Sequence, residues 1–512
     1  MRRMPAASVP PMTAATTTPG EPGPQVVDAL IEIGESFQEA VDAFPGGTEF
    51  SVAAGVHRLA SVKPKQGDVF VGEPGAVLSG AALVTDWRAD GDFWAAGGFD
   101  LQSDRWVKYE GRACLDETAD GLGSGPGACR FPHLLYLDDQ VLTPIVDRSE
   151  LISGTFLFDY ERGEIWIADD PNGRRMELAV TALAFDALDR KNVTIEGLTV
   201  EKYATGLQTA AIQGGAGWVI KDCVVRWNHG FGIKVGSGSH VSGCRVHGQG
   251  QGGAGWVIKD CVVRWNHGFG IKVGSGSHVS GCRVHGQGQG GVKVVNGATG
   301  VIYENNEIDY NGLGGVNPLW EGGGSKFVES IDLVVRGNNV HHNYGPGLWT
   351  DFNNVNTFYE GNTVVDNAGA GIMHEISHQA VIKNNIVTGN GYEMLLGGIY
   401  ISNSDDVEVV GNTLENNKVA VLARQADRDV PVENLNVHDN LIIKTRGEGY
   451  AAGLIVEAGG NEFFTSKGNV FQANTYNLGP EYTRPFHWMG GLRRPEAWQS
   501  YGNDTSGNFN LG

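Results

Sequence analysis

The chain has 512 residues, of which 41% are hydrophobic, so it can bury a large core. It contains no run of about 18 apolar residues, and the sequence therefore predicts no membrane-spanning helix and no membrane partner. Its formal net charge of −21 disfavours a nucleic-acid partner, because phosphate binding needs clustered Lys and Arg. The charge argues less strongly against an acidic polysaccharide, since a local basic patch is compatible with it.

The N-terminal residues 1–25 are rich in Pro, Thr and Ala. They include Arg2 and Arg3 but lack the apolar segment of a secretory signal peptide. We expect a disordered leader. The sequence does not distinguish a cytoplasmic protein from a secreted one whose start is misassigned.

Two different patterns follow. Residues 26–86 contain short β-prone runs between glycines and predict the first coils of a solenoid with its cap. Residues 87–178 break this pattern with longer β runs and aromatic residues, so we expect an inserted β-sandwich. Within the insert, Cys114 and Cys129 flank a Gly- and Asp-rich loop and are candidates for a local disulfide.

Residues 179–483 repeat a short phrase in which a β run is followed by two polar positions five residues apart. The first asparagines of successive units are 32, 24, 23 and 27 residues apart, which is typical of a repeat architecture. The repeated pairs are Asn306 and Asn311, Asn338 and Asn343, Asn362 and Asn367, Asn385 and Asn390, and Asn412 and Asn417.

Each unit holds several runs of three to five β-formers and has no room for a helix. The sequence therefore predicts an all-β, right-handed parallel β-helix with the inserted β-sandwich near its N-terminus. Aligned asparagines would form an amide ladder that satisfies the turn backbone. We expect residues 484–512 to cover the last coil, because an open solenoid end invites edge pairing.

One segment, 213–291, contains an exact repeat: residues 213–253 are identical to residues 251–291, at an offset of 38. We interpret it as a recent duplication or an assembly error rather than a selected feature. Because 38 is not a whole number of typical coils, we expect a junction coil short by about one strand and a local distortion.

Four cysteines follow the same repeat: Cys223, Cys244, Cys261 and Cys282. They fall where asparagine stands in later coils, and we expect stacked free thiols rather than disulfides. The cysteines form no CxxC pair, which argues against structural zinc.

The chemistry is expected between residues 320 and 378. Aligning the glycine-led strands places Lys326, Asp351 and Glu375 in one column on neighbouring coils. Two carboxylates one coil apart stand about 5 Å from each other, the separation of a retaining glycosidase; inverting enzymes need about 6.5–9.5 Å. Their repulsion would raise one pKa, while Lys326 would keep the other carboxylate ionised.

Other side chains nearby are candidates for substrate binding. Trp349 and Trp320 offer sugar-stacking surfaces, and Glu321, His374 and His378 offer hydrogen bonds to hydroxyls. The two histidines reach that side only if the chain turns near Glu375. The alternative without a function is a solvated ladder of charged side chains on one face of the solenoid. The Trp and His residues close to these charges disfavour it, because a solvated face rarely needs them.

The motifs Trp320–Phe327, Gly347–Asp351 and Gly371–Ser377 resemble bacterial right-handed β-helix carbohydrate-active proteins, and most closely the β-helix β-xylosidase family. That resemblance spans residues 45–480 and implies a carbohydrate substrate, Asp351 as nucleophile and Glu375 as acid/base. It also implies substrate-binding roles for Glu321 and Lys326. It implies no cofactor.

Three alternatives stay open. The first is a polysaccharide lyase or uronate epimerase, in which Lys326 with His374 or His378 would act on uronates. The second is a non-catalytic carbohydrate-binding solenoid. The third is a zinc enzyme, since His374, Glu375 and His378 match H-E-x-x-H; a strand would separate the histidines by about 13 Å, so we assign no metal ligand. The sequence is compatible with homo-oligomer formation.

Overall fold

The computed structural model describes residues 28–101, 132–206, 209–229, 231–246, 250–252, 254–265, 269–313, 317–394 and 396–512. The predicted leader 1–25 and the candidate disulfide between Cys114 and Cys129 lie outside these residues.

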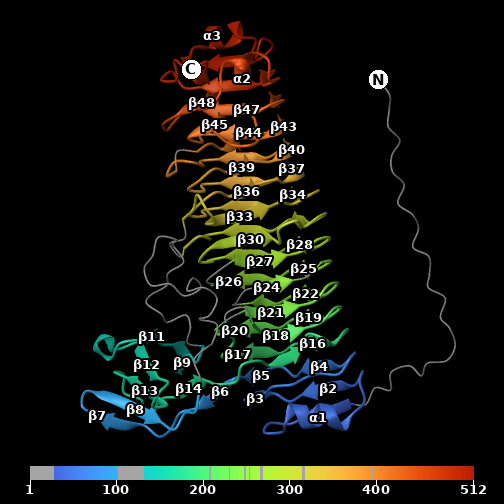
Figure 1. Cartoon of the computed structure of the whole chain (residues 1–512), viewed down its shortest axis with the longest axis vertical. Helices are drawn as coiled ribbons and strands as arrows, with labels where there is room; N and C mark the ends of the chain where they lie inside the picture. The colour runs from blue at the N-terminus through green and yellow to red at the C-terminus, as the bar shows by residue number, and fades with distance from the viewer. Residues whose placement is uncertain are drawn as a thin grey trace, which may run out of the picture.

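Three long sheets wind into one solenoid, and each coil adds one strand to each sheet (Figure 1). In the described residues, the first sheet has 15 strands, the second 15 and the third 14. Neighbouring strands pair in parallel, apart from the last two strands of the third sheet. This arrangement confirms the predicted all-β, right-handed parallel β-helix. The sheets run from β1 (Asp28–Ile31) to β49 (Val470–Gln472), from β3 (Gly55–Arg58) to β53 (Asn508–Leu511), and from β15 (Phe185–Ala187) to β52 (Gly491–Arg493).

The predicted asparagine ladder is present and buried. Asn338 Oδ1 accepts hydrogen bonds from Asn306 N at 3.0 Å and from Asn306 Nδ2 at 2.9 Å. Each amide also donates to a strand carbonyl of the preceding coil, as Asn362 Nδ2 does to Val335 O at 2.9 Å. The ladder therefore satisfies turn groups that would otherwise be buried without partners. It continues beyond the repeat through Asn440 and Asn474.

The cysteines occupy the same column below the asparagines. Cys223, Cys244, Cys261 and Cys282 are buried free thiols. The backbone N–H of Cys282 donates to Asn306 Oδ1 at 3.0 Å, which joins the two ladders. The prediction of stacked thiols is confirmed.

The exact repeat does not distort the sheets. Its junction coil keeps three strands, β22 (His240–Ser242), β23 (Arg245–Val246) and β24 (Gly250–Gly252), and all three pair with the coils on both sides. The expected missing strand and bulge are therefore wrong. The 38-residue offset equals two coils, one longer than the other, so the register survives. Shorter strands absorb most of the difference in length: β23 and β24 have two and three residues, where β20 (Val224–Arg226) and β21 (Phe231–Val235) of the preceding coil have three and five.

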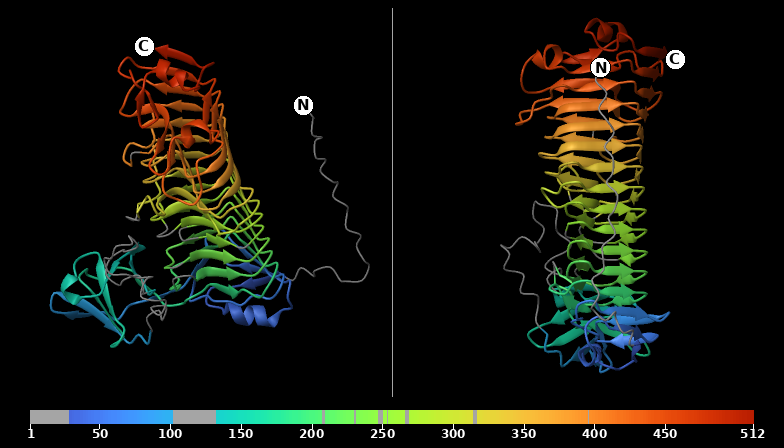
Figure 2. Two further views of the ribbon diagram at one scale, coloured as in Figure 1. Left: turned by 45° about the horizontal axis from the view of Figure 1, so that its top comes forward. Right: turned by 90° about the vertical axis from the view of Figure 1, so that its right-hand side faces the viewer.

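The insert consists of two small sheets packed around an apolar core that includes Leu137, Phe156 and Ile165. It lies beside the first coils (Figures 1 and 2), and Lys202 of the solenoid forms ion pairs with Asp139 and Glu177 of the insert. Its strands are β6 (Ala81–Leu83), β7 (Arg88–Asp90), β8 (Phe93–Gly97), β9 (Leu135–Leu137), β10 (Gln140–Val141), β11 (Thr143–Ile145), β12 (Thr155–Asp159), β13 (Glu164–Ile167) and β14 (Met176–Ala179).

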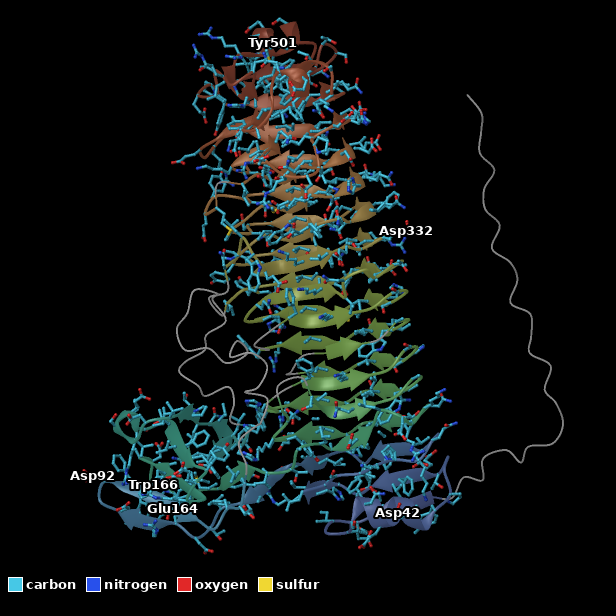
Figure 3. All side chains as sticks on the ribbon, viewed as in Figure 1. Asp42, Asp92, Glu164, Trp166, Asp332 and Tyr501 are labelled. Carbon is cyan, nitrogen blue, oxygen red and sulfur yellow. The ribbon has the colours of Figure 1, made fainter. Side chains whose placement is uncertain are left out.

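Both ends of the solenoid core are covered. Helix α1 (Phe37–Ala43) buries Phe37 and Val41 against the first coils. At the other end, α3 (Pro495–Ser500) buries Trp498, and strand β53 adds one more rung to the second sheet. Figure 3 labels Asp42 on the first cap and Tyr501 on the second. The remaining helix, α2 (Glu462–Thr465), is short, and no helix in the described part of the chain is long and apolar enough to cross a membrane.

The amide ladder should carry much of the stability of the central coils. Asn362→Ala removes the partners of the Asn338 N–H and the Val335 carbonyl, which stay buried. We expect the free energy of unfolding to fall by about 2–5 kcal/mol, since each unsatisfied group costs about 1–3 kcal/mol. Denaturant unfolding measures it, with Asn436→Ala as the control, because the Asn436 side chain bonds only at the exposed surface. Equal losses in both variants would contradict the ladder's role.

The exact repeat should be removable. Deleting residues 213–250 joins Ile212 to Gln251 and restores the sequence context of the first copy, so the register is kept. We expect a soluble chain that unfolds cooperatively, as followed by circular dichroism. Deleting residues 213–240 instead would join strands of different sheets, and we expect that control to aggregate. Aggregation of both variants would show that the repeat is required.

Candidate active site

The candidate carboxylates lie on neighbouring strands of the third sheet. Asp351 pairs in register with Glu375, and Glu375 pairs with Ser402. Parallel strands lie about 4.8 Å apart, so both carboxylates leave the sheet on the same side, one coil apart. This places the two groups as the sequence predicted. The strands are β33 (Gly323–Val328), β36 (Leu348–Asp351), β39 (Ile372–Glu375), β42 (Ile399–Ser402) and β45 (Val419–Gln425).

Lys326 is not in the column of the two carboxylates, which corrects the sequence alignment. Phe327 pairs with Thr350, so Lys326 stands opposite Trp349, two positions before Asp351. Its long side chain nevertheless reaches diagonally, and Lys326 Nζ lies 2.9 Å from Asp351 Oδ2. The ammonium also lies 3.8 Å from the centroid of the Trp349 ring. The ion pair places a cation directly beside the Asp351 carboxylate.

Glu375 has the opposite electrostatic environment. Burial of its carboxyl, together with the charge of Asp351, raises the pKa of Glu375 to about 7. Lys326, Arg428 and a contact with the Trp349 indole lower this pKa but do not cancel the increase. The two carboxyl groups therefore have different surroundings: Asp351 is paired with a lysine, while Glu375 is buried with a raised pKa.

Polar side chains inside the solenoid hold the turns that follow both carboxylates. Asn354 Nδ2 donates to the Asp351 carbonyl at 2.9 Å, and Ser377 Oγ donates to the Glu375 carbonyl at 2.7 Å. Ile376, directly after Glu375, has a φ of 44°, which is strained for a β-branched residue. Sequence reasoning missed these positioning residues, although Asn354 and Ser377 repeat at the spacing of one coil.

Trp349 is covered rather than open. It is 1% exposed and packs with Met373 and Tyr400 in an apolar cluster on the outer side of the third sheet. This burial contradicts the expectation that Trp349 is a sugar-stacking surface. Trp349 instead helps to cover the site from water, and its indole contacts the Glu375 carboxyl.

Neither His374 nor His378 lies with the two carboxylates: His374 points into the solenoid core, and His378 is on a strand of the first sheet. His374 is fully buried inside the solenoid, where its Nδ1 and Thr350 Oγ1 are 2.7 Å apart. Burial lowers the pKa of His374 to about 3, so the ring is neutral. The expectation that His374 contacts sugar hydroxyls is contradicted. His378 follows the turn on a strand of the first sheet, with its Nδ1 2.8 Å from Asp405 Oδ1. The H-E-x-x-H letters therefore span a strand and a turn, not one helix face.

Trp320 and Glu321 lie on the loop that precedes β33. Trp320 is 46% exposed, and its backbone carbonyl accepts a hydrogen bond from Lys326 Nζ, so this part of the loop lies close to the site. Glu321 is 2.5 Å from Lys293 Nζ and 2.6 Å from Gln289 Nε2. The structure thus brings Lys326, Trp320 and Glu321 to the same side of the sheet as Asp351.

Arg428 is the main charged group that sequence reasoning missed. It lies in the exposed loop after β45, close enough to Glu375 to lower the pKa of that carboxyl. No repeat spacing marks it, because the loop belongs to a longer coil. Its exposure makes it available to a substrate.

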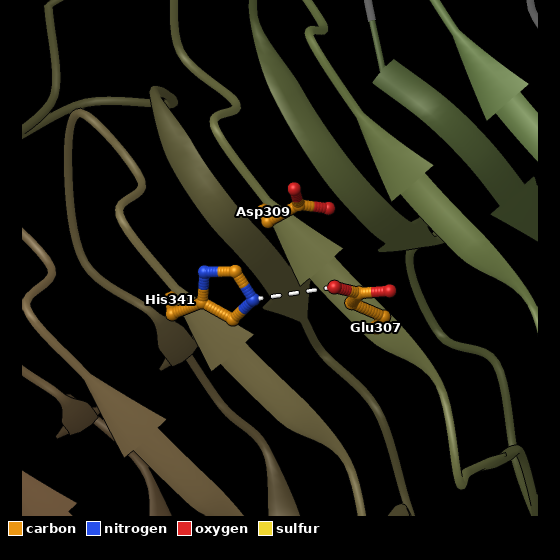
Figure 4. Close-up of side chains that lie close together, drawn as sticks. All are labelled: Glu307, Asp309 and His341. Carbon is orange, nitrogen blue, oxygen red and sulfur yellow. Dashed lines mark ion pairs between the residues drawn. The ribbon is translucent and has the colours of Figure 1, made fainter.

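A second acidic cluster lies elsewhere, on the second sheet. Ligand atoms of Glu307, Asp309 and His341 lie within 4.8 Å of one another (Figure 4). Arg283 already neutralises this cluster, with its guanidinium 2.8 Å from Asp309 and 3.4 Å from Glu307. The cluster therefore reads as an ion-pair network, and we assign no metal to it.

Comparison with known proteins supports the fold. A family model described as "right handed beta helix region" matches residues 249–419. None of the curated proteins matches the chain significantly. The structure of XylC in complex with xylose is 15% identical, with a TM-score of 0.50 over 86% of this chain and 81% of that one.

Two further structures are more distant. The A-module of the Azotobacter vinelandii mannuronan C-5 epimerase AlgE6 is 12% identical, with a TM-score of 0.37 over 93% of this chain and 92% of that one. A mannuronic acid specific polysaccharide family 6 lyase from human gut microbiota is 10% identical, with a TM-score of 0.41 over 90% and 87%. The likeness to the XylC structure, at 15% identity, shows the fold alone.

The charge of Lys326 should set the protonation of Glu375. In Lys326→Met, a cation that lowers the Glu375 pKa is removed, so this pKa should rise further above 7. Carbon-13 NMR of the Glu375 carboxyl against pH measures the shift. Lys383→Met, which breaks an ion pair with Glu360 at the surface, is the control and should leave the titration unchanged. A lower Glu375 pKa in Lys326→Met would contradict the assigned electrostatics.

Proposed function

We propose that this protein is a retaining glycoside hydrolase with Asp351 as nucleophile and Glu375 as acid/base. The observation that carries the proposal is the pair of carboxyl groups in register one coil apart, each with different surroundings. Asp351 is ion-paired with Lys326 at 2.9 Å, while burial and Asp351 raise the pKa of Glu375 to about 7. A retaining mechanism needs this combination of a carboxylate and a carboxylic acid about 5 Å apart.

The reaction would use the two groups in sequence. Glu375 donates its proton to the glycosidic oxygen while Asp351 attacks the anomeric carbon, so the bond to the leaving sugar breaks and a glycosyl ester forms. Glu375, now ionised, takes a proton from water. That water attacks the anomeric carbon, releasing the sugar and restoring Asp351.

The substrate is proposed to be an oligosaccharide, with xylosides first among the candidates. The sequence resemblance to β-helix β-xylosidases and the likeness to a structure bound to xylose support this choice. Trp320, exposed beside the site, is the proposed stacking surface. Glu321 and Lys326 keep their proposed binding roles, and Arg428 joins them. His378 keeps a proposed role through its pair with Asp405, whereas His374 and Trp349 act only by supporting the site.

Removing either carboxyl group should abolish turnover. We expect Glu375→Gln and Asp351→Asn each to lower kcat/KM on an aryl xyloside by about 10²–10⁴-fold or more, because each loses proton transfer or the covalent step. Asp332→Asn, on the exposed turn labelled in Figure 3, is the control and should retain activity. In Asp351→Gly, azide should restore turnover and give a glycosyl azide. Hydrolysis by the unmutated chain with inversion at the anomeric carbon would overturn the proposal. So would the formation of unsaturated uronates from a uronate polymer.

The dependence of kcat/KM on pH should reflect the titration of the Glu375 carboxyl. Because Glu375 must be protonated to act first, kcat/KM should decline as pH rises through about 7. The same limb should be absent from Glu375→Gln when an activated leaving group needs no proton. An alkaline limb that persists in this variant would assign the acid to another residue.

A further inference from the structure

A column of lysines leads along the third sheet to the candidate active site. Lys272 on β27 (Phe269–Val273) pairs in register with Lys293 on β30 (Gly290–Val294), and Lys293 pairs with Lys326. The residues on either side of Lys272 are buried in the solenoid core, so strand alternation directs the lysines outward. Asp351 and Glu375 leave the sheet on this same side.

Two of these lysines have an acidic partner. Lys326 pairs with Asp351 at 2.9 Å, and Lys293 pairs with Glu321 at 2.5 Å. Gln289 supplies a second hydrogen bond to Glu321, so each oxygen of that carboxylate has one partner from this column or its neighbourhood.

Lys272 is different from its neighbours in the column. It is half-buried, and across the described ranges its ammonium has no hydrogen bond and no ion pair. Burial and the charge of Lys293 lower the pKa of Lys272, against a smaller opposing effect of Glu321. Partial burial of an unpaired charge is unfavourable, and an anion from outside the chain would remove the cost.

The exact repeat has lengthened this column without shifting it. Lys234 is the counterpart of Lys272 in the first copy, and both pair with Gln251 between them. Because the repeat equals two coils, the added lysine falls in the same column. The third sheet therefore carries four lysines in one column, although the whole chain has a net charge of −21.

We propose that Lys272 binds a carboxylate of the substrate, so that the oligosaccharide carries a uronic acid and lies along the outer face of the third sheet toward Asp351. This inference rests on the proposed hydrolase function. Three strand spacings separate the coils of Lys272 and Asp351, about 14 Å, which a short oligosaccharide spans. A sulfate ester offers the same charge, and the experiment separates the two sources.

Binding is measured by calorimetry in the Glu375→Gln chain, so that no turnover is needed. The probes are xylotriose, xylotriose with a glucuronic acid branch, and xylotriose with a sulfate ester. We expect the uronate-bearing probe to bind most tightly. Adding Lys272→Gln should weaken its binding about tenfold to a hundredfold, the scale of a hydrogen bond to a charged group. Gln is tolerated in this column, as Gln213 and Gln251 show.

Two further variants serve as controls for the charge of Lys272. Lys272→Arg should retain the preference for the uronate, and Lys259→Met, an exposed lysine of the first sheet, should not alter it. Equal affinity for neutral and acidic probes, or no loss in Lys272→Gln, would overturn the inference. If the sulfate ester binds most tightly, the ligand of Lys272 is a sulfate ester and the proposed uronate is wrong. A uronate preference without hydrolysis of any glycoside by the unmutated chain would remove the hydrolase but not the anion site.

Discussion

The structure depends on rung-to-rung register in a parallel stack. Each strand residue lies beside its counterpart in the next coil, at the spacing of a β-sheet. The buried amide ladder fixes this register, because Asn338, Asn362 and Asn385 each bond both the next amide and the backbone of a neighbouring turn. A slip of one residue would break these bonds in every coil at once and turn each core side chain outward.

The chemistry of the candidate site follows from the same constraint. Two carboxyl groups in register cannot move apart, so their repulsion is built into the fold and not relieved by rotation of a loop. The apolar cluster around Trp349 excludes water from one side, and Lys326 approaches from the preceding coil. These neighbours differ for the two carboxyl groups: a lysine pairs with Asp351, whereas burial and the charge of Asp351 raise the pKa of Glu375. The proposed acid/base and nucleophilic roles depend on such a difference in surroundings.

The sequence predicts those features that depend on spacing alone. The asparagine and cysteine columns were predictable because a coil returns to the same position after a nearly fixed number of residues. The alignment of Lys326 failed because three consecutive glycines, Gly322 to Gly324, offer several starting points for β33. The structure pairs that strand so that Gly324 stands opposite Gly347, a choice that packing makes and a run of identical residues cannot encode.

Side-chain direction was predictable where the strand period was applied strictly. If Glu375 faces outward, its neighbour His374 must face the core, as it does. The alignment of glycines placed Trp349, Met373 and Tyr400 in one column, as the structure does. It did not predict that this apolar column is covered, because Leu396 and Tyr450, which pack against it, lie outside the aligned strands. Arg428 was missed for the same reason: it belongs to a loop whose position depends on tertiary packing.

Net charge is a poor guide to what a solenoid binds. A chain at −21 appears unsuited to an acidic ligand, yet register concentrates Lys272, Lys293 and Lys326 on one line of one sheet. Screening confines each surface charge to its surroundings within about 8–10 Å, so a ligand on that line meets the column rather than the average of the molecule. In a repeat protein the relevant charge is therefore counted along each column of the stack, and the composition of the whole chain conceals it.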